Sequence, residues 1–335
     1  MSTAQPPIAP DYADRSTRLM VAGMLACVCG LFAVMMAALI MLRSTLGPPR
    51  GHATNLPLDI KSTVFCLLAA VAFVWLGIGL AKARRWAWTL TVVLSWMWLV
   101  FGALGFATVV FFMSQMKDEA IVQHGDAKVA SSGAMTAIMI GVGVFGACIT
   151  LLMPVVFLML CHSQPVRATC WKRDPKARWT DRCPMPVLAL TIFHANSIWT
   201  MLWLMASQRT MPLFGMLLSG ASGAALILVI VLVLGWLAWG TYRLQMAAWW
   251  GTLLVGIVSA SNMVVTHWHA DLAKMYEKMG MPADRLDLIQ KTGIVDATSF
   301  WAPRIGLLVG AAWLGYLIFV RRYFVRSHEE RTARS

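Results

Sequence analysis

The stretch LMVAGMLACVCGLFAVMMAALIML, residues 19–42, decides the fold class, because its 24 residues contain no charged side chain. About 20 apolar residues in a helix are enough to cross the roughly 30 Å hydrocarbon core of a bilayer. A secretory signal has a shorter apolar region, of roughly 7 to 15 residues, that ends at a small-residue cleavage site. The stretch therefore predicts a transmembrane helix rather than a cleaved signal.

Similar apolar stretches recur along the rest of the chain. Charged residues make up only 13% of the sequence and apolar residues 59%, whereas a soluble domain has roughly 25% charged residues. Eight predicted spans cover residues 19–42, 64–81, 86–113, 134–161, 187–207, 213–240, 246–266 and 305–320. The sequence predicts an all-α integral membrane bundle of about eight transmembrane helices.

The basic residues predict an orientation. If the N-terminus is cytoplasmic, 17 of the 28 Lys and Arg residues fall in cytoplasmic segments, as the positive-inside rule requires. We therefore expect an inner (plasma) membrane protein with both termini in the cytoplasm. The net charge of +13 is then a topology signal and an attraction to anionic lipid at the inner face, not a sign of nucleic-acid binding.

The predicted spans divide into two halves of four. The predicted segments are a cytoplasmic tail (1–18), a first half (19–161), a basic cytoplasmic linker (162–186), a second half (187–322) with an outer loop (267–304), and a basic cytoplasmic tail (323–335). The segment RWAWTLTVV (85–93) resembles AAWWGTLLV (247–255), which pairs Trp86 with Trp249. This likeness suggests two parallel four-helix halves, although short apolar segments also resemble one another by composition alone.

Two local patterns predict further structure. Leu272, Met275, Tyr276 and Met279 lie at helical spacing, which predicts an amphipathic helix in the outer loop between spans seven and eight. Small residues four apart predict close contacts between helices. Three such sets are Gly306 with Gly310, Gly133 with Ala137 and Gly141, and Gly215 with Ser219 and Gly223.

The stretch ATCWKRDPKARWTDRCPMPVL, residues 168–188, separates the predicted halves. Cys161, Cys170 and Cys183, with His162, supply zinc-ligand chemistry, but the sequence has no CxxC pair there, and structural zinc sites usually use such tight pairs. Basic residues, two tryptophans and prolines indicate an anchor and linker instead.

Polar residues inside the predicted spans are few. No Asp, Glu, Lys or Arg lies in the middle of any span, which argues against an ion-coupled pump. The polar interior candidates are His194, Asn196, Ser259 and Asn262. They either form hydrogen bonds between helices, or line a polar path for a small substrate.

Four histidines fall on the predicted outer side. On a helix, His267 and Asp271 share a face while His269 does not, so all three can hold one ion only in an extended segment. His267, His269 and Asp271, with His52 and His124, form a candidate metal site. The alternative is that these five are unrelated polar loop residues. Haem is not predicted, because no two histidines face each other at one depth, and no other cofactor is expected.

No motif of a soluble enzyme class is present. The sequence has no phosphate-cradling glycine loop, no Gly-x-Ser-x-Gly and no His-Glu-x-x-His. We expect a non-enzymatic membrane protein for passive small-molecule transport or permeation. The alternatives are a membrane scaffold or accessory subunit, acting with a membrane-protein partner or as a homo-oligomer, and a metal-handling protein that uses the outer histidines.

Overall fold

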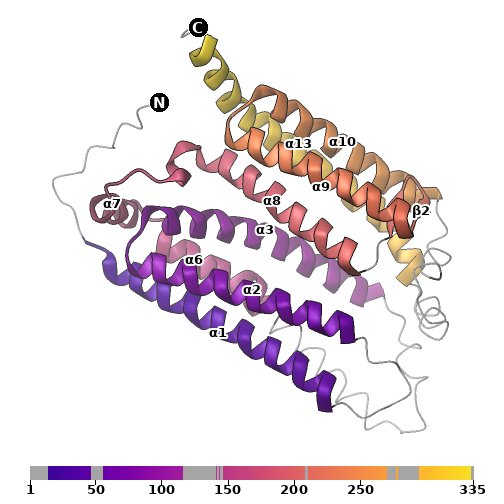
Figure 1. The fold of residues 1–335 in the computed structure, drawn as a ribbon, viewed down its shortest axis with the longest axis horizontal. Coiled ribbons are helices and arrows are strands. Elements are labelled where there is room, and N and C mark those ends of the chain that lie inside the picture. The colour runs from indigo at the N-terminus through magenta and orange to yellow at the C-terminus, as the bar shows by residue number, and fades with distance from the viewer. Residues whose placement is uncertain are drawn as a thin grey trace. The chain divides into compact units, whose positions relative to one another are not determined.

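The computed structural model describes residues 14–46, 56–115, 141, 143, 146–207, 210–269, 277 and 294–332. Its elements in chain order are α1 Ser16–Leu46, α2 Leu56–Ala81, α3 Arg85–Gln115, the π-helical turn η1 Cys148–Leu152, α6 Met153–Cys161, α7 Gln164–Arg173, the 3-10 turn η2 Trp179–Arg182, α8 Met185–Ser207, β1 Met211–Leu213, β2 Met216–Leu218, α9 Gly220–Tyr242, α10 Met246–His269 and α13 Ile294–Thr332 (Figure 1). The predicted amphipathic helix of the outer loop and the start of predicted span four lie outside the described residues.

Seven of the described helices are long and apolar enough to cross a membrane, and an eighth span results if α6 and α7 are counted together. This confirms the predicted all-α membrane bundle of about eight transmembrane helices. The pair α6 and α7 is bent by 64°. The bend lies at Ser163, which has extended backbone, and Pro165 is the second residue of α7. A helix continuing through this point would be broken there, because proline has no N–H for the carbonyl four residues earlier.

The outward faces of the long helices are apolar. Leu31 in α1, Val71 in α2 and Ile318 in α13 are each 66–69% exposed. A soluble monomer rarely exposes large contiguous apolar patches, whereas hydrocarbon chains of a bilayer accept such side chains without penalty. The protein is therefore a multi-pass membrane protein, with its polar contacts gathered at helix ends and at a few buried positions.

The chain forms two compact units. The first comprises Met1–Val100 and Ile149–Arg182, and the second comprises Phe101–Cys148 and Cys183–Ser335. The chain passes from one unit to the other inside α3, inside η1 and just after η2, so most of the basic stretch between the predicted halves packs within the first unit. The domain boundaries drawn from the sequence stay a prediction.

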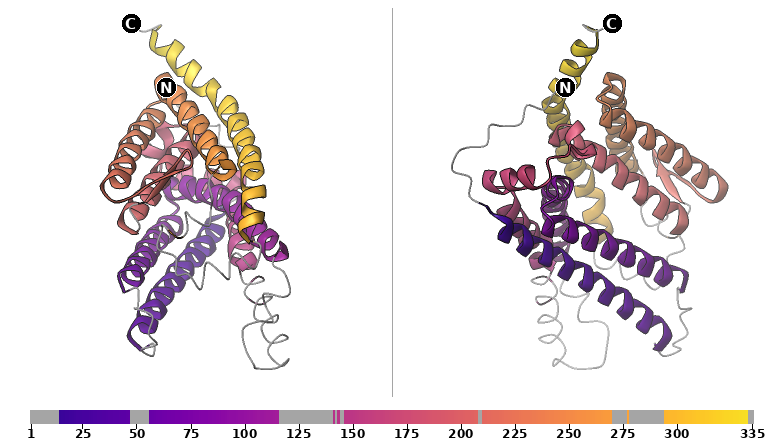
Figure 2. Two further views of the ribbon diagram at one scale, coloured as in Figure 1. Left: turned by 90° about the vertical axis from the view of Figure 1, so that its right-hand side faces the viewer. Right: turned by 60° about the vertical axis from the view of Figure 1, so that its left-hand side comes forward.

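Glycines allow α1 and α2 of the first unit to pack closely. The two helices lie side by side in each view (Figure 2). A Cβ added at Gly23 would lie 2.6 Å from the carbonyl oxygen of Gly77, and one added at Gly77 would lie 2.6 Å from Sγ of Cys27. Such contact through small residues is how helices associate where no hydrophobic force draws them together. The sequence analysis did not identify this pair.

The predicted span over residues 213–240 is wrong at its start. Residues 211–218 form a two-stranded antiparallel hairpin, with Leu213 opposite Met216, and α9 begins only at Gly220. Phe214 and Gly215, between the strands, have φ of 46° and 85°; two consecutive positive φ angles match a type I′ hairpin turn. The expected small-residue helix face that included Gly215 therefore does not exist.

The other small-residue predictions have different outcomes. A Cβ at Gly306 of α13 would lie 2.7 Å from Sδ of Met263 in α10, and one at Gly310 would lie 3.8 Å from Ala260, so this predicted packed face is confirmed. No heavy atom of the described residues would meet a Cβ at Gly141. Gly133 and Ala137 lie outside the described residues.

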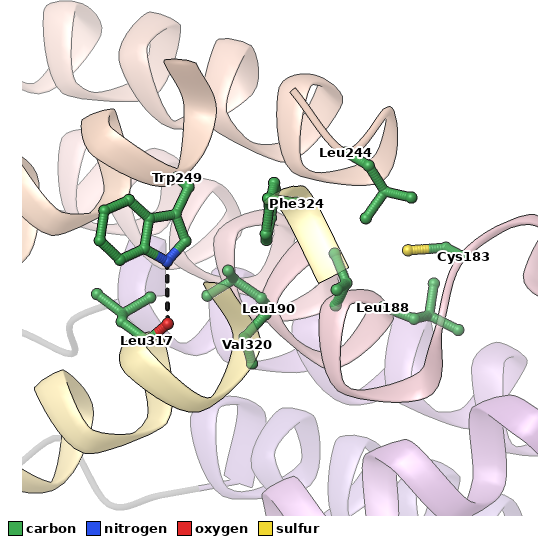
Figure 3. Packing of buried hydrophobic residues seen from close by; sticks show 9 residues of the cluster. Cys183, Leu188, Leu190, Leu244, Trp249, Leu317, Val320 and Phe324 are labelled. Carbon is green, nitrogen blue, oxygen red and sulfur yellow. Dashed lines mark hydrogen bonds between the residues drawn. The ribbon is translucent and has the colours of Figure 1, made fainter. Parts of the chain in front are cut away.

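The second unit has its apolar core where α8, α10 and α13 meet beside the α9–α10 turn (Figure 3). The buried side chains are Cys183, Val187, Leu188, Leu190, Leu244, Trp249, Leu317, Val320 and Phe324. Trp249 donates a 2.9 Å hydrogen bond from Nε1 to the carbonyl of Leu317. This bond fastens α10 to α13 across the apolar core.

A helix–turn–helix segment occurs once in each unit. WLGIGLAKARRWAWTLT (75–91) matches WLAWGTYRLQMAAWWGT (236–252) without gaps. Ala83 and Leu244 occupy the same position in the two segments and have φ of 50° and 55°. The amide of the next residue donates to a carbonyl five residues back in both segments, from Arg84 to Gly79 and from Gln245 to Gly240.

The side chains of the two segments are buried in the same way. Trp88 donates a 2.7 Å hydrogen bond to the carbonyl of Cys161, as Trp249 does to that of Leu317. A Cβ at Gly79 would lie 2.6 Å from Cβ of Ala87, and the second segment repeats this close approach. Trp88, not Trp86, is therefore the equivalent of Trp249, and the pairing predicted from the sequence is wrong by two residues.

Candidate functional site

A buried charged cluster closes the first unit where α3 begins. Its members, called here the Arg85 cluster, are Arg84, Arg85, Asp174, Arg178 and Asp181. Asp174 accepts hydrogen bonds from Nε and Nη2 of Arg178, at 3.2 and 3.0 Å, and lies 3.5 Å from Nη1 of Arg84. It also accepts from the backbone amide of Arg85 at 3.3 Å. Asp181 lies 3.4 Å from Nη2 of Arg85.

The electrostatics of the cluster favour the ionised acids. Burial raises the pKa of Asp174, but hydrogen bonds from Arg178 and from the Arg85 amide, with the charges of Arg178 and Arg84, outweigh burial and place this pKa below the ordinary 3.8. Nε of Arg85 has no hydrogen-bond partner among the described residues. Ionised pairs of this burial hold a structure in one arrangement, and their breakage leaves a charge without compensation.

Aromatic rings cover the charged cluster. Trp171 of α7 lies between two guanidinium groups, with its ring centre 4.4 Å from Cζ of Arg85 and 4.8 Å from that of Arg167. Trp88 meets Trp171 edge to face at 5.3 Å. Cations over an indole face are attracted by its negative charge distribution. The stretch read from the sequence as an anchor is therefore a packed part of the first unit.

Helix α7 also holds the beginning of α1. The amide of Arg15 donates to Oγ1 of Thr169 at 3.2 Å, and Arg173 forms a 2.8 Å ion pair with Asp14. Residues more than 150 positions apart in sequence thus meet on one short helix. The contacts of α7 with α1 and α3 hold these helices together.

Two cysteines near this end of the first unit are buried, Cys170 in α7 and Cys183 at the start of the second unit. Burial raises the pKa of the Cys183 thiol to about 12. A thiol must lose its proton to bind a metal. No group of three or more His, Cys, Asp or Glu side chains in the described part of the chain is arranged to hold a metal ion.

A polar seam crosses the helices of the second unit. Its members are Thr191 and His194 on α8, Thr241 at the end of α9, and Thr252 on α10. Oγ1 of Thr191 lies 3.2 Å from Oγ1 of Thr241, and Nε2 of His194 lies 3.1 Å from Oγ1 of Thr252. His194 is only 2% exposed. Its Nδ1 has no hydrogen-bond partner among the described residues.

The other predicted polar candidates do not join His194. Asn262 accepts a 2.6 Å hydrogen bond from the amide of Phe214 and donates one of 3.3 Å to the carbonyl of Pro212, so it holds the hairpin. Asn196 and Ser259 have exposed side chains on α8 and α10. Within the described residues, no recorded hydrogen bond links any of these three side chains to His194, and their place on one path stays a prediction.

The predicted metal site is described only in part. His52, His124 and Asp271 lie outside the described residues, as does the side chain of His269. The ring of His267 donates from Nδ1 to the carbonyl of Met263 at 2.8 Å, because a carbonyl can only accept. Metal binding by these residues stays a prediction.

The sequence analysis found His194 but missed its partners. Thr191, Thr241 and Thr252 look like ordinary threonines of apolar helices, and the hydroxyl of each lies within hydrogen-bond distance of a carbonyl of its own helix. The signal that could have identified them is the repeat, because Thr252 occupies the position of Thr91 in the first unit. The Arg85 cluster was likewise missed, because the ion pairs of Arg84 and Arg85 join them to acids at least 90 positions away.

Comparison of the sequence with protein-family models, curated proteins and solved structures finds no match.

Proposed function

We propose that the protein is a non-enzymatic membrane component through which a small polar molecule passes passively, and that this molecule makes its polar contacts at the seam of the second unit. The observation that carries the proposal is His194, whose ring is buried while Nδ1 has no partner among the described residues. A buried polar group without a hydrogen bond costs about 1–3 kcal/mol. Polar groups kept inside a membrane usually mark a substrate or ion pathway.

The sequence favours passive rather than coupled movement. Ion-coupled transporters commonly use an intramembrane carboxylate or a similar charged group, and no Asp, Glu, Lys or Arg lies in the middle of the eight predicted spans. The seam itself is built from hydroxyl groups and one imidazole. Such groups can bind a neutral polar molecule weakly, which is what rapid passage requires.

The distribution of basic residues supports an inner membrane location with both termini in the cytoplasm. In this orientation α7 and the Arg85 cluster lie at the cytoplasmic face. Arg167, exposed and stacked on Trp171, is then available to the headgroups of anionic lipid. Reporter fusions at the C-terminus test this orientation, since an active periplasmic reporter would contradict it.

Flux measurements test the proposed function. The purified protein is reconstituted in liposomes, and the entry of water, urea and glycerol is followed by light scattering against empty liposomes. We expect faster entry of at least one solute, and loss of the increase in a His194→Leu variant. Thr91→Val is the matched control, because Thr91 occupies the position of Thr252 in the first unit and its hydroxyl has no partner among the described residues. Equal rates with and without protein would refute the proposal.

A further inference from the structure

The hydrogen bonds of Thr252 determine which nitrogen of His194 carries the proton. A hydroxyl group has one proton, and Thr252 donates its proton to the carbonyl of Ala248 at 2.8 Å. If Nε2 of His194, at 3.1 Å, donates to this hydroxyl oxygen, both hydrogen bonds of Thr252 form, whereas a hydroxyl that donated to Nε2 would leave the bond to Ala248 unmade. The arrangement with more hydrogen bonds places the proton of the neutral ring on Nε2.

The same reasoning leaves a lone pair on Nδ1. The ring is 2% exposed among apolar helices, where a charged imidazolium without a carboxylate partner is strongly disfavoured. Nδ1 of the neutral ring is then an acceptor, and among the described residues nothing donates to it. A donor from outside the protein can complete this hydrogen bond.

His267 in the same unit shows how a helical histidine can satisfy Nδ1 locally. Its Nδ1 donates to the carbonyl of Met263, four residues earlier, at 2.8 Å. His194 cannot do this in its present state, because the single ring proton is on the Nε2 side. The contrast separates a histidine whose Nδ1 is satisfied by its own helix from one that presents an acceptor.

We propose that Nδ1 of His194 binds the passing molecule as a hydrogen-bond acceptor, so that the permeant class is small uncharged hydrogen-bond donors, water and primary amides among them. This inference rests on the proposed function of the seam. Cations are disfavoured because the described side chains of the seam include no acid, and anions because the ring offers them no proton. Polar molecules without a donor have nothing to give to Nδ1.

Two isomeric amides test the donor requirement at constant size. Propionamide has an N–H₂ group, and N,N-dimethylformamide has the same formula and no N–H. The protein-dependent part of the flux into liposomes is measured for both, with the wild type, His194→Phe and the control Thr91→Val. We expect propionamide flux to exceed that of its isomer by about fivefold or more. The excess should vanish in His194→Phe and persist in Thr91→Val.

Nitrogen NMR of histidine-labelled protein tests the ring itself, with His194→Phe used to assign the signal. We expect a protonated Nε2, and an unprotonated Nδ1 whose resonance shifts when propionamide is added and not when its isomer is added. A proton on Nδ1, or an equal response to both isomers, would overturn the inference. If both isomers cross equally through the protein, passive passage stands and the donor requirement falls. If neither crosses while Nδ1 responds to propionamide, the acceptor role stands and the proposed function falls.

Discussion

The α2–α3 turn and the α9–α10 turn have the same backbone conformation, and each is followed by a buried tryptophan. The two turns differ in where polar side chains lie around them. In the first unit, Arg85 begins α3 and is held by Asp181, while the buried hydroxyl of Thr91 has no partner among the described residues. In the second unit, Met246 stands in the place of Arg85, and Thr252 in the place of Thr91 bonds to His194. The first unit thus has its polar contacts at the helix ends, and the second has them deeper between helices.

The difference shows that the same helix–turn–helix segment can carry polar side chains in two different roles. Ion pairs at a helix end lie near water and lipid headgroups, where charged groups are tolerated, so they can serve stability alone. A histidine between helices has no such reason to be there, because apolar packing would serve as well. The comparison therefore favours a structural role for the Arg85 cluster, and it agrees with the role in permeation that we propose for His194.

Substitution of Asp174 should have the largest effect on stability, and it tests the structural role of the Arg85 cluster most directly. Asp174→Ala removes the buried acceptor of Arg84, of Arg178 and of the Arg85 amide, while the two partly exposed guanidinium groups can turn to solvent. We expect the free energy of unfolding to fall by about 2 kcal/mol, measured by tryptophan fluorescence in mixed micelles. Asp14→Ala, which breaks the exposed pair with Arg173, should have no measurable effect. Equal effects of the two substitutions would show that the cluster is not the main support of this end.

Acid should act on the same carboxylate reversibly. The pKa of Asp174 is lowered in the folded protein, so its stabilisation is fully present above the ordinary value of 3.8 and is lost as the pH falls through the lower folded value. We expect wild-type stability to fall more steeply than that of Asp174→Ala in this acidic range. Parallel curves for the two proteins would show that Asp174 does not contribute to acid sensitivity.

The two tryptophans test whether the turns are equivalent in energy as well as in shape. Trp88→Phe and Trp249→Phe each remove an indole N–H and its hydrogen bond, to the carbonyl of Cys161 or to that of Leu317. We expect each substitution to lower the free energy of unfolding by about 1–2 kcal/mol. An effect in one unit only would mean that the shared geometry does not give a shared contribution.

Substitution of Thr252 or Thr91 should have the smallest effect on stability, and the two effects should differ in direction. Thr252→Val removes the acceptor of His194 and should destabilise by about 0.6 kcal/mol, a typical value for a hydrogen bond between membrane helices. Thr91→Val removes a buried hydroxyl that has no partner among the described residues, so stability should be unchanged or slightly higher. A larger loss from Thr91→Val than from Thr252→Val would reverse our assignment of roles.

The sequence was sufficient for the spans and insufficient for their contacts. The apolar character of a segment does not depend on the rest of the chain. A transmembrane helix over residues 19–42 can therefore be predicted from that stretch alone. The hairpin over residues 211–218 misled the analysis, because MPLFGMLL is as apolar as a span and only the turn at Phe214 and Gly215 separates it from α9.

The candidate site was predictable only for His194. A lone histidine in an apolar segment stands out, and its position between helices followed from the span that contains it. Its partner Thr252 did not stand out, and Asn262, which did, bonds to the hairpin instead. Which side chains meet depends on helix rotation and on pairing between distant segments, and neither is written in local composition.

The contacts of α7 with the start of α1 also constrain the order of events during synthesis. Asp14 and Arg173 are 159 residues apart in sequence, and a ribosome adds roughly 5–20 residues each second. The beginning of α1 therefore waits about 10 to 30 seconds for its partner. During that interval α1, α2 and α3 are synthesised, but the contacts of Asp14 and Arg15 with α7 cannot yet form. Insertion factors and proteases can therefore reach this end of the first unit until α7 has been synthesised.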